Sequence, residues 1–205
     1  MRLVHWALVV LIPFAWWSAT HDHLAWHLVC GLTILGLLVF RLIWGVIGSP
    51  AARFARFLAG PRTVSAYVRG RLDRAVAGHN PLGGWSVVAM LAALCLQVGL
   101  GLFSINEDGD EGGPLSGRVS FEAARAATHL HHRLFWVVVA LAGLHIAAIG
   151  FYAIRRQNLV AAMISGRGTL PAGTQPEPPM KLWRAVAGAV VAAVVAVLIA
   201  RNLRL

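Results

Sequence analysis

Long apolar runs separated by short polar stretches make up most of the chain. Four runs are long enough to cross a bilayer, since a spanning helix needs about 20 mainly apolar residues; they cover residues 26–47, 84–103, 134–154 and 183–200. A further run, from Leu3 to about Thr20, is slightly shorter. Counted along the chain, it is the first of the five runs. Each run is expected to be helical because a helix satisfies its own backbone within lipid. The pattern predicts an all-α integral membrane four-helix bundle with a fifth, C-terminal transmembrane helix.

The first run has two interpretations. Because Arg2 precedes an apolar core, it could be a signal peptide. However, the core contains a histidine and three tryptophans, and no Ala-x-Ala cleavage site follows it, so we predict a retained helix. The expected organisation is then a four-helix domain over residues 1–157, a cytoplasmic linker over 158–182 and a transmembrane helix over 183–205.

The polar stretches differ in charge. The loop over residues 48–83 contains six arginines, and further basic residues follow the fourth run. The loop after the first run has neither Lys nor Arg, and the loop after the third contains the acidic stretch NEDGDEGG. Because cytoplasmic loops carry an excess of Lys and Arg, the N-terminus and both arginine-rich loops are predicted to face the cytoplasm. Arg201 and Arg204 depart from this rule, since they end the fifth helix on the opposite side.

Composition agrees with a membrane protein. Of the 205 residues, 58% are hydrophobic and 13% charged, with a mean hydropathy of +0.69, whereas about a quarter of a soluble domain is charged. The net charge of +10 comes from the loop arginines, which suits anionic lipid head groups rather than nucleic acid. Cys30 and Cys95 lie in apolar runs and are interpreted as small buried side chains. No Cys-x-x-Cys-His motif occurs, so covalent haem attachment is not predicted.

Histidines are the main candidates for chemistry. Polar side chains within membrane spans are costly and are usually functional. The histidines that lie in apolar runs or at their edges are His5, His27, His131 and His145. The others are interpreted as solvated or interfacial side chains: His21, His23, His79, His129 and His132.

Helix geometry selects between the histidines of the fourth run. His131 and His145 are 14 residues apart, which places them on one helix face about 21 Å apart. His132 and His129 are about 140° and 160° out of register with His145. One metal ion cannot bind both histidines, since a ligand nitrogen lies only about 2.1 Å from its metal. The two histidines must therefore serve two centres, each completed from another helix.

The expected depth of each histidine predicts the partners. His27 begins the second run at the outer side, level with His131, and His5 lies near the inner end of the first run, nearest in depth to His145. The predicted pairs are therefore His27 with His131 and His5 with His145. Two bis-histidine centres stacked across a membrane suit two non-covalent haems b, whose potentials the apolar surroundings would tune.

A few neighbouring residues could line these centres. Gly31, four residues after His27, leaves space for a flat macrocycle, although ordinary helix packing explains it equally well. Arg41 lies on nearly the same helix face as His27. It could pair with a haem propionate or could reach the membrane interface as a snorkelling side chain. Further candidates are Gly143 and one of Gly99 and Gly101.

Several stretches resemble the bacterial cytochrome b561 group, which includes the b-type cytochrome subunits of membrane-bound nickel–iron hydrogenases. They are RLVHW (2–6), HLVCGLTILGLLVFRLIWGVIGSPAARF (27–54), HNPLGGWSVVAMLAALCLQVGLGLF (79–103), LHHRLFWVVVALAGLH (130–145) and NLVAAMISGR (158–167). The resemblance covers about residues 2–167. It implies that histidines of helices one, two and four bind two haems b, and these match the four histidines selected above. His132 stands where relatives often have an acid.

The resemblance also implies a function. We expect electron transfer in the bacterial inner membrane between a quinone pool and a partner at the outer face, such as a hydrogenase, another dehydrogenase or reductase, or a c-type cytochrome. A homodimer is a further expected assembly. No nucleophile–base constellation occurs, so oxidoreductase activity would be quinone chemistry or would belong to a complex.

Two other functions remain open. A histidine-lined cation or proton transporter usually carries acidic residues within the membrane, and none of the five apolar runs contains one. A membrane anchor subunit without a redox role would tolerate the loss of all four histidines.

Overall fold

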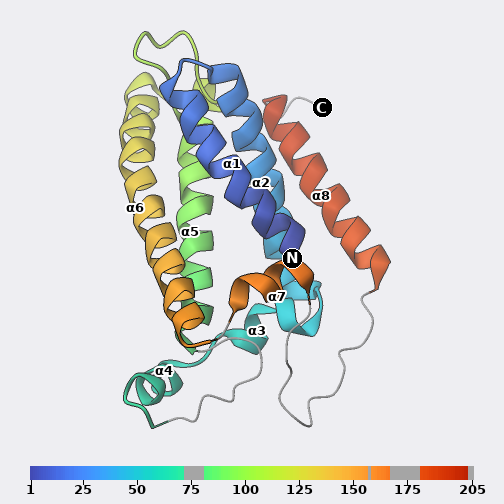
Figure 1. Ribbon diagram of the computed structural model, residues 1–205. Helices are drawn as coiled ribbons and strands as arrows, with labels where there is room; N and C mark the ends of the chain where they lie inside the picture. The colour runs from blue at the N-terminus through green and yellow to red at the C-terminus, as the bar shows by residue number, and fades with distance from the viewer. Residues whose placement is uncertain (72–80, 157, 167–180, 203–205) are drawn as a thin grey trace.

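Five long helices form the framework of the protein. The computed structural model describes residues 1–71, 81–156, 158–166 and 181–202. Within them, five helices are long and apolar enough to cross a membrane: α1 (Arg2–Thr20), α2 (Leu24–Ile47), α5 (Pro81–Phe103), α6 (Phe121–Ile154) and α8 (Leu182–Ala200). They run alternately in opposite directions (Figure 1). The prediction of an all-α membrane protein is confirmed.

Four of these helices enclose the interior, and one lies outside. α1 packs along α2, α6 packs along α5, and α2 and α5 join the two halves. Their shared core includes Ile34, Leu38, Leu91, Leu94 and Val138. α1 and α6 do not pack closely along their length, and ring side chains span the space between them. One example is the stacked pair of Trp16 and Phe135, whose ring centroids are 6.2 Å apart.

α8 packs on the outer side of α2 through small residues (Figure 1). A Cβ atom at Gly188 would lie 3.5 Å from both Phe40 and Ile43, so the two helices approach closely there. Both ends of α8 are also tied down. Arg184 donates to the Ile47 carbonyl at 3.4 Å, and Arg118 donates to the Asn202 carbonyl at 2.7 Å.

α6 begins much earlier than the apolar pattern predicted. We expected this helix over residues 134–154, but it starts at Phe121. The Ser120 side chain caps it by accepting from the Ala123 amide at 3.3 Å, and an N-cap of this type stabilises a helix start. The first turns were missed because they are too polar to count as part of a span. His129 and His132, expected at the helix entry, therefore lie inside α6.

Short helices occupy segments that we had predicted to be loops or a linker. The stretch after α2 contains the 3-10 turn η1 (Pro50–Ala52), α3 (Phe54–Phe57) and α4 (Pro61–Val68). Both η1 and α4 start with proline, whose missing N–H costs nothing at a helix start. A second 3-10 turn, η2 (Ser116–Arg118), precedes α6, and α7 (Leu159–Ser165) opens the expected linker. Residues 167–180 of that linker lie outside the described part of the chain.

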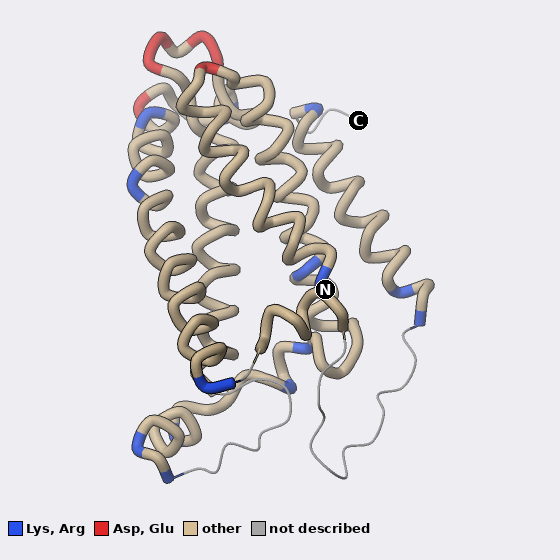
Figure 2. The backbone as a smooth tube through the Cα atoms, in the orientation of Figure 1, with Lys and Arg blue, Asp and Glu red and all other residues tan. Residues whose placement is uncertain are grey.

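Charge separates the two ends of the bundle (Figure 2). The described acidic residues gather at the end where α5 and α6 are joined, and we call this the acidic end. Most described Lys and Arg residues lie at the opposite end, where α1 begins, and we call this the arginine-rich end. The described chain finishes beside the acidic end, after α8.

Candidate functional site

The four histidines selected from the sequence form two pairs of neighbouring rings. His27 of α2 and His131 of α6 have ring centroids 6.0 Å apart at an interplanar angle of 88°. His5 of α1 and His145 of α6 have centroids 6.4 Å apart at 58°. All four side chains are partly buried. The structure thus brings together the histidines that helix register and depth had paired.

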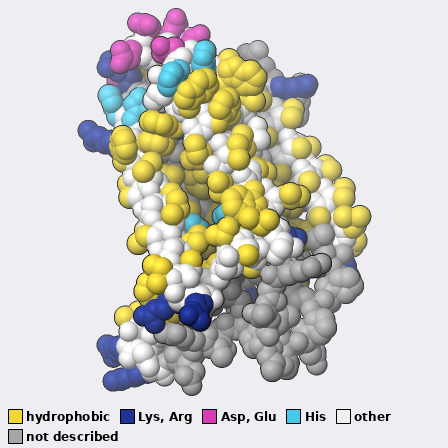
Figure 3. All heavy atoms as spheres, in the orientation of Figure 1, with side chains coloured by type: hydrophobic (Ala, Val, Ile, Leu, Met, Phe, Trp, Pro, Cys, Tyr) yellow, Lys and Arg dark blue, Asp and Glu magenta, His cyan; other side chains and the backbone are white. Residues whose placement is uncertain are grey.

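The remaining described histidines have different surroundings. They are exposed: His21, His23, His129 and His132. Figure 3 shows histidine side chains beside the acidic end. His21 bonds to the Trp17 carbonyl of its own helix at 2.9 Å. His79 lies outside the described residues. The exposed set therefore differs from the paired set in burial.

Backbone carbonyls orient both rings of the outer pair, His27 and His131. The Nδ1 atom of His27 lies 2.8 Å from the Ala15 carbonyl of α1, and Nδ1 of His131 lies 2.8 Å from the Gln97 carbonyl of α5. A carbonyl only accepts, so each Nδ1 must carry the hydrogen and each Nε2 keeps its lone pair. Metal-binding histidines are held in this way, because the second bond fixes the tautomer and the ring orientation.

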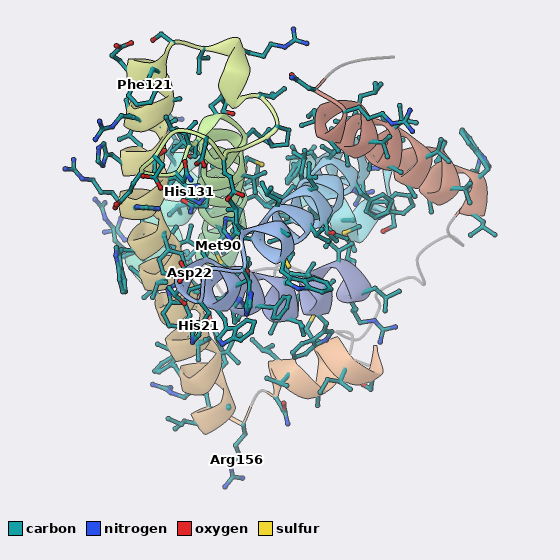
Figure 4. All side chains as sticks on the ribbon, turned by 90° about the horizontal axis from the view of Figure 1, so that it is seen from above. His21, Asp22, Met90, Phe121, His131 and Arg156 are labelled. Atoms are coloured by element: carbon teal, nitrogen blue, oxygen red, sulfur yellow. The ribbon has the colours of Figure 1, made fainter. Side chains whose placement is uncertain are left out.

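A glycine allows His131 to approach α5. His131 extends from α6 toward α5 (Figure 4), where it meets the carbonyl of Gln97. Gly101 lies one helical turn after Gln97, beside that carbonyl. A Cβ atom at Gly101 would lie 3.0 Å from Cε1 and 3.2 Å from Nδ1 of the His131 ring. We therefore infer that any larger residue at position 101 would displace the ring.

The Gln97 side chain also contacts His131. Its Nε2 lies 3.3 Å from Nε2 of His131, and its Oε1 is buried without a hydrogen-bond partner in the described part of the chain. Since Nε2 of His131 holds the lone pair, the amide must be the donor. This amide would have to turn aside for a metal to take that lone pair. Sequence reasoning assigned Gln97 no role.

The inner pair, His5 and His145, is less tightly bonded. Nδ1 of His5 is buried and has no hydrogen-bond partner among the residues that the structure describes. The end of α7 closes this region from the arginine-rich end. Arg2 donates to the Ile164 carbonyl at 3.0 Å, and the Trp6 indole donates to the Met163 carbonyl at 3.4 Å. These bonds fix the start of α1, which carries His5.

The ring separation within each pair would allow its two histidines to hold one iron. Two imidazoles on opposite sides of a metal, each about 2.0 Å from it, have ring centroids about 6 Å apart. Both observed separations are close to this value. Within the described residues, no three His, Cys, Asp or Glu side chains are grouped so that they could hold a bare metal ion. Two histidines per centre match a haem, whose macrocycle supplies the other ligands.

Open space for a flat group occurs on the helices that carry the pairs. A Cβ atom at Gly31, on the helix of His27, or at Gly143, on the helix of His145, would meet nothing within 4 Å. An apolar cavity of about 380 Å³ lies between α1, α5 and α6, and its wall includes Gly143, Phe135 and Met90. On α6, this wall lies between the levels of His131 and His145. The burial of the rings and the apolar lining are the surroundings that a non-covalent haem requires.

Arg41 has local partners in the structure. Its Nη1 donates to the Ala52 carbonyl at 3.4 Å, and its guanidinium lies 4.9 Å from the centre of the Phe54 ring. These contacts hold the segment that follows α2. Within the described residues Arg41 makes no ion pair, so its pairing with a propionate stays a prediction.

Comparison with known proteins identifies the family. The family model described as prokaryotic cytochrome b561 matches residues 1–166, which include α1 to α7 but not α8. No curated protein and no solved structure matches the chain significantly. The match covers the four bundle helices and both histidine pairs. The chain therefore belongs to the prokaryotic cytochrome b561 family and is a multi-pass membrane protein that binds haem b and transfers electrons.

Proposed function

We propose that the protein carries electrons across the bacterial inner membrane through two bis-histidine haems b. His27 and His131 would hold one haem, and His5 and His145 the other. The observation that carries this proposal is the pair of ring separations, 6.0 and 6.4 Å, at two levels of one helix. When bound, haem b supplies an iron that gains or loses one electron.

The chain itself contributes orientation and exclusion of water. The Ala15 and Gln97 carbonyls hold the hydrogen on Nδ1 of His27 and His131, so Nε2 would be the atom of each ring that binds the proposed iron. The apolar side chains that line the cavity between the two levels would disfavour water and ions beside the haems. Gly31 would leave space beside the outer haem, and Arg41 would offer a positive charge to a propionate.

We further propose that the electrons pass between the quinone pool and a partner at the outer face. The partner would be a hydrogenase, another dehydrogenase or reductase, or a c-type cytochrome. The positive-inside rule supports a cytoplasmic location for the N-terminus and the arginine-rich end. In this orientation His27 and His131 lie toward the outer face, where the partner would exchange electrons.

Two alternative functions are less well supported. A cation transporter would need clustered ligands, but the described residues contain no such group of three. A redox-inactive anchor would gain nothing from partly buried imidazoles held in one tautomer by neighbouring helices. Polar groups placed within a membrane span are costly, and that cost favours a functional role.

Transmembrane electron transfer tests the proposal. Purified protein would be reconstituted into vesicles that contain ferricyanide, and a quinol would be added outside. We expect the wild type to reduce the trapped oxidant, and His131→Ala and His145→Ala to abolish the reaction because each removes one relay. His132→Ala is the matched control, since this neighbouring ring is exposed. Wild-type rates in both His131→Ala and His145→Ala would refute the proposal.

A further inference from the structure

Three arginines line one surface cavity at α4. This helix is well separated in the sequence from the four paired histidines. The cavity has a volume of about 460 Å³ and is lined by Pro61, Arg62, Ser65, Ala66, Arg69 and Arg71. Counting from Arg62, the lining positions follow the spacing i, i+3, i+4 and i+7, which places them on one face of the helix. Arginines at both ends of this face therefore point to the same cavity.

The turn after α4 brings the third arginine to this face. Gly70 has φ +68°, a conformation that glycine adopts without strain. The Gly70 amide bonds to the Tyr67 carbonyl at 3.0 Å, and the Arg71 amide bonds to the Ala66 carbonyl at 2.9 Å. This pattern is a Schellman motif, which folds the chain back over the last helical turn. As a result, Arg71 lies beside Arg69 instead of continuing away from the helix.

The opposite face of α4 is apolar. It carries Val64, Tyr67 and Val68, and Val68 is 65% exposed. The Trp85 indole near the start of α5 donates to the Ala59 carbonyl at 2.9 Å, which holds the entry to α4 close to the end of a spanning helix. A short amphipathic helix in this position lies in the membrane interface, with its apolar face toward the acyl chains and its basic face toward the head groups.

Charge at this end of the protein favours an anionic ligand. The described acidic residues lie at the opposite end (Figure 2). Among the described residues, Arg62, Arg69 and Arg71 have no ion-pair partner. A guanidinium matches phosphate oxygens in both charge and geometry. We propose that the α4 cavity binds the phosphate group of an anionic phospholipid through Arg62, Arg69 and Arg71, with the Ser65 hydroxyl as a further donor.

Lipid binding by the purified full-length protein tests this site. Binding of phosphatidylglycerol, phosphatidylcholine and inorganic phosphate would be measured by native mass spectrometry and by thermal stabilisation. The test variant is Arg62→Gln/Arg69→Gln/Arg71→Gln. The matched control is Arg56→Gln/Arg155→Gln/Arg156→Gln, which removes the same charge from exposed positions near the same end. Helical circular dichroism would report folding without reference to haem.

We expect phosphatidylglycerol to bind the wild type and the control more tightly than phosphatidylcholine does. The cavity variant should bind phosphatidylglycerol on the order of a hundredfold more weakly at low salt. Gly70→Val keeps every charge but strains the turn, so it should also weaken binding. Equal weakening in cavity and control variants, or unchanged affinity in Gly70→Val, would overturn the proposal. Inorganic phosphate competing as well as the lipid would identify a soluble ligand and overturn the lipid assignment.

Discussion

At the scale of single residues, the outer histidine pair depends on two helices, α1 and α5, that contribute neither of its rings. The four histidines could be selected from the sequence because register along α6 and depth across the membrane are simple functions of position. The carbonyl groups that orient their rings could not be predicted from the sequence, since the Gln97 carbonyl and His131 are 34 residues apart. Which carbonyl faces which ring depends on how α5 and α6 pack. The close approach of Gly101 to His131 has the same origin.

Gly101→Ala is expected to weaken the outer haem site. The new methyl group would lie 3.0 Å from the His131 ring, which forces the ring away from the Gln97 carbonyl. We expect lower haem content and an altered midpoint potential for one haem, measured by haem assay and redox titration. Gly99→Ala is the matched control, because its Cβ meets nothing within 4 Å. Identical haem content and potentials in both variants would contradict the account of Gly101.

At the scale of elements, the apolar pattern predicted which helices exist better than where they end. The spans around α2, α5 and α8 agree with the structure within about three residues, whereas α6 begins 13 residues before the predicted start at 134. Its first turns depend on the Ser120 cap and on buried small residues such as Ala124 and Ala127, not on a continuous apolar run. α3, α4 and α7 were missed because they are too short to establish a periodic pattern.

Gly188→Leu is expected to detach α8 from α2. A Cβ at this position already lies 3.5 Å from Phe40 and Ile43, so a leucine would overpack the contact at a cost of about 1–3 kcal/mol. Thermal unfolding in detergent should occur at a lower temperature. Val190→Leu, at a position that is 56% exposed, serves as the control and should have little effect. Equal stability of both variants would show that this helix contact is unimportant.

At the scale of the whole molecule, the charge asymmetry and the alternating helices predict one orientation in the membrane. Most positive charge lies at one end and the described acidic residues lie at the other. Arg201 follows α8 at the end of that helix that lies near the acidic end, against the general trend, and a fifth crossing by α8 would explain this position. The sequence alone predicted this conflict, and the bonds of Arg118 to Asn202 place the end of α8 beside η2.

Cysteine labelling of intact cells tests this orientation. In a background without Cys30 and Cys95, Asp108→Cys and Asn202→Cys should react with a membrane-impermeant maleimide in spheroplasts. Arg56→Cys should react only after lysis, because it lies at the arginine-rich end. Labelling of Asn202→Cys only after lysis would mean that α8 does not complete a fifth crossing. Reversed labelling of Asp108→Cys and Arg56→Cys would invert the proposed orientation.

The ratio of haem b to polypeptide is the most direct test of the proposed double centre. The purified wild type, saturated with haem, should contain two haems b per chain with two resolvable midpoint potentials. His27→Ala and His131→Ala should each lose the same haem, while His5→Ala and His145→Ala should each lose the other. One haem or none in the saturated wild type, or a loss that does not follow these two pairs, would contradict the account.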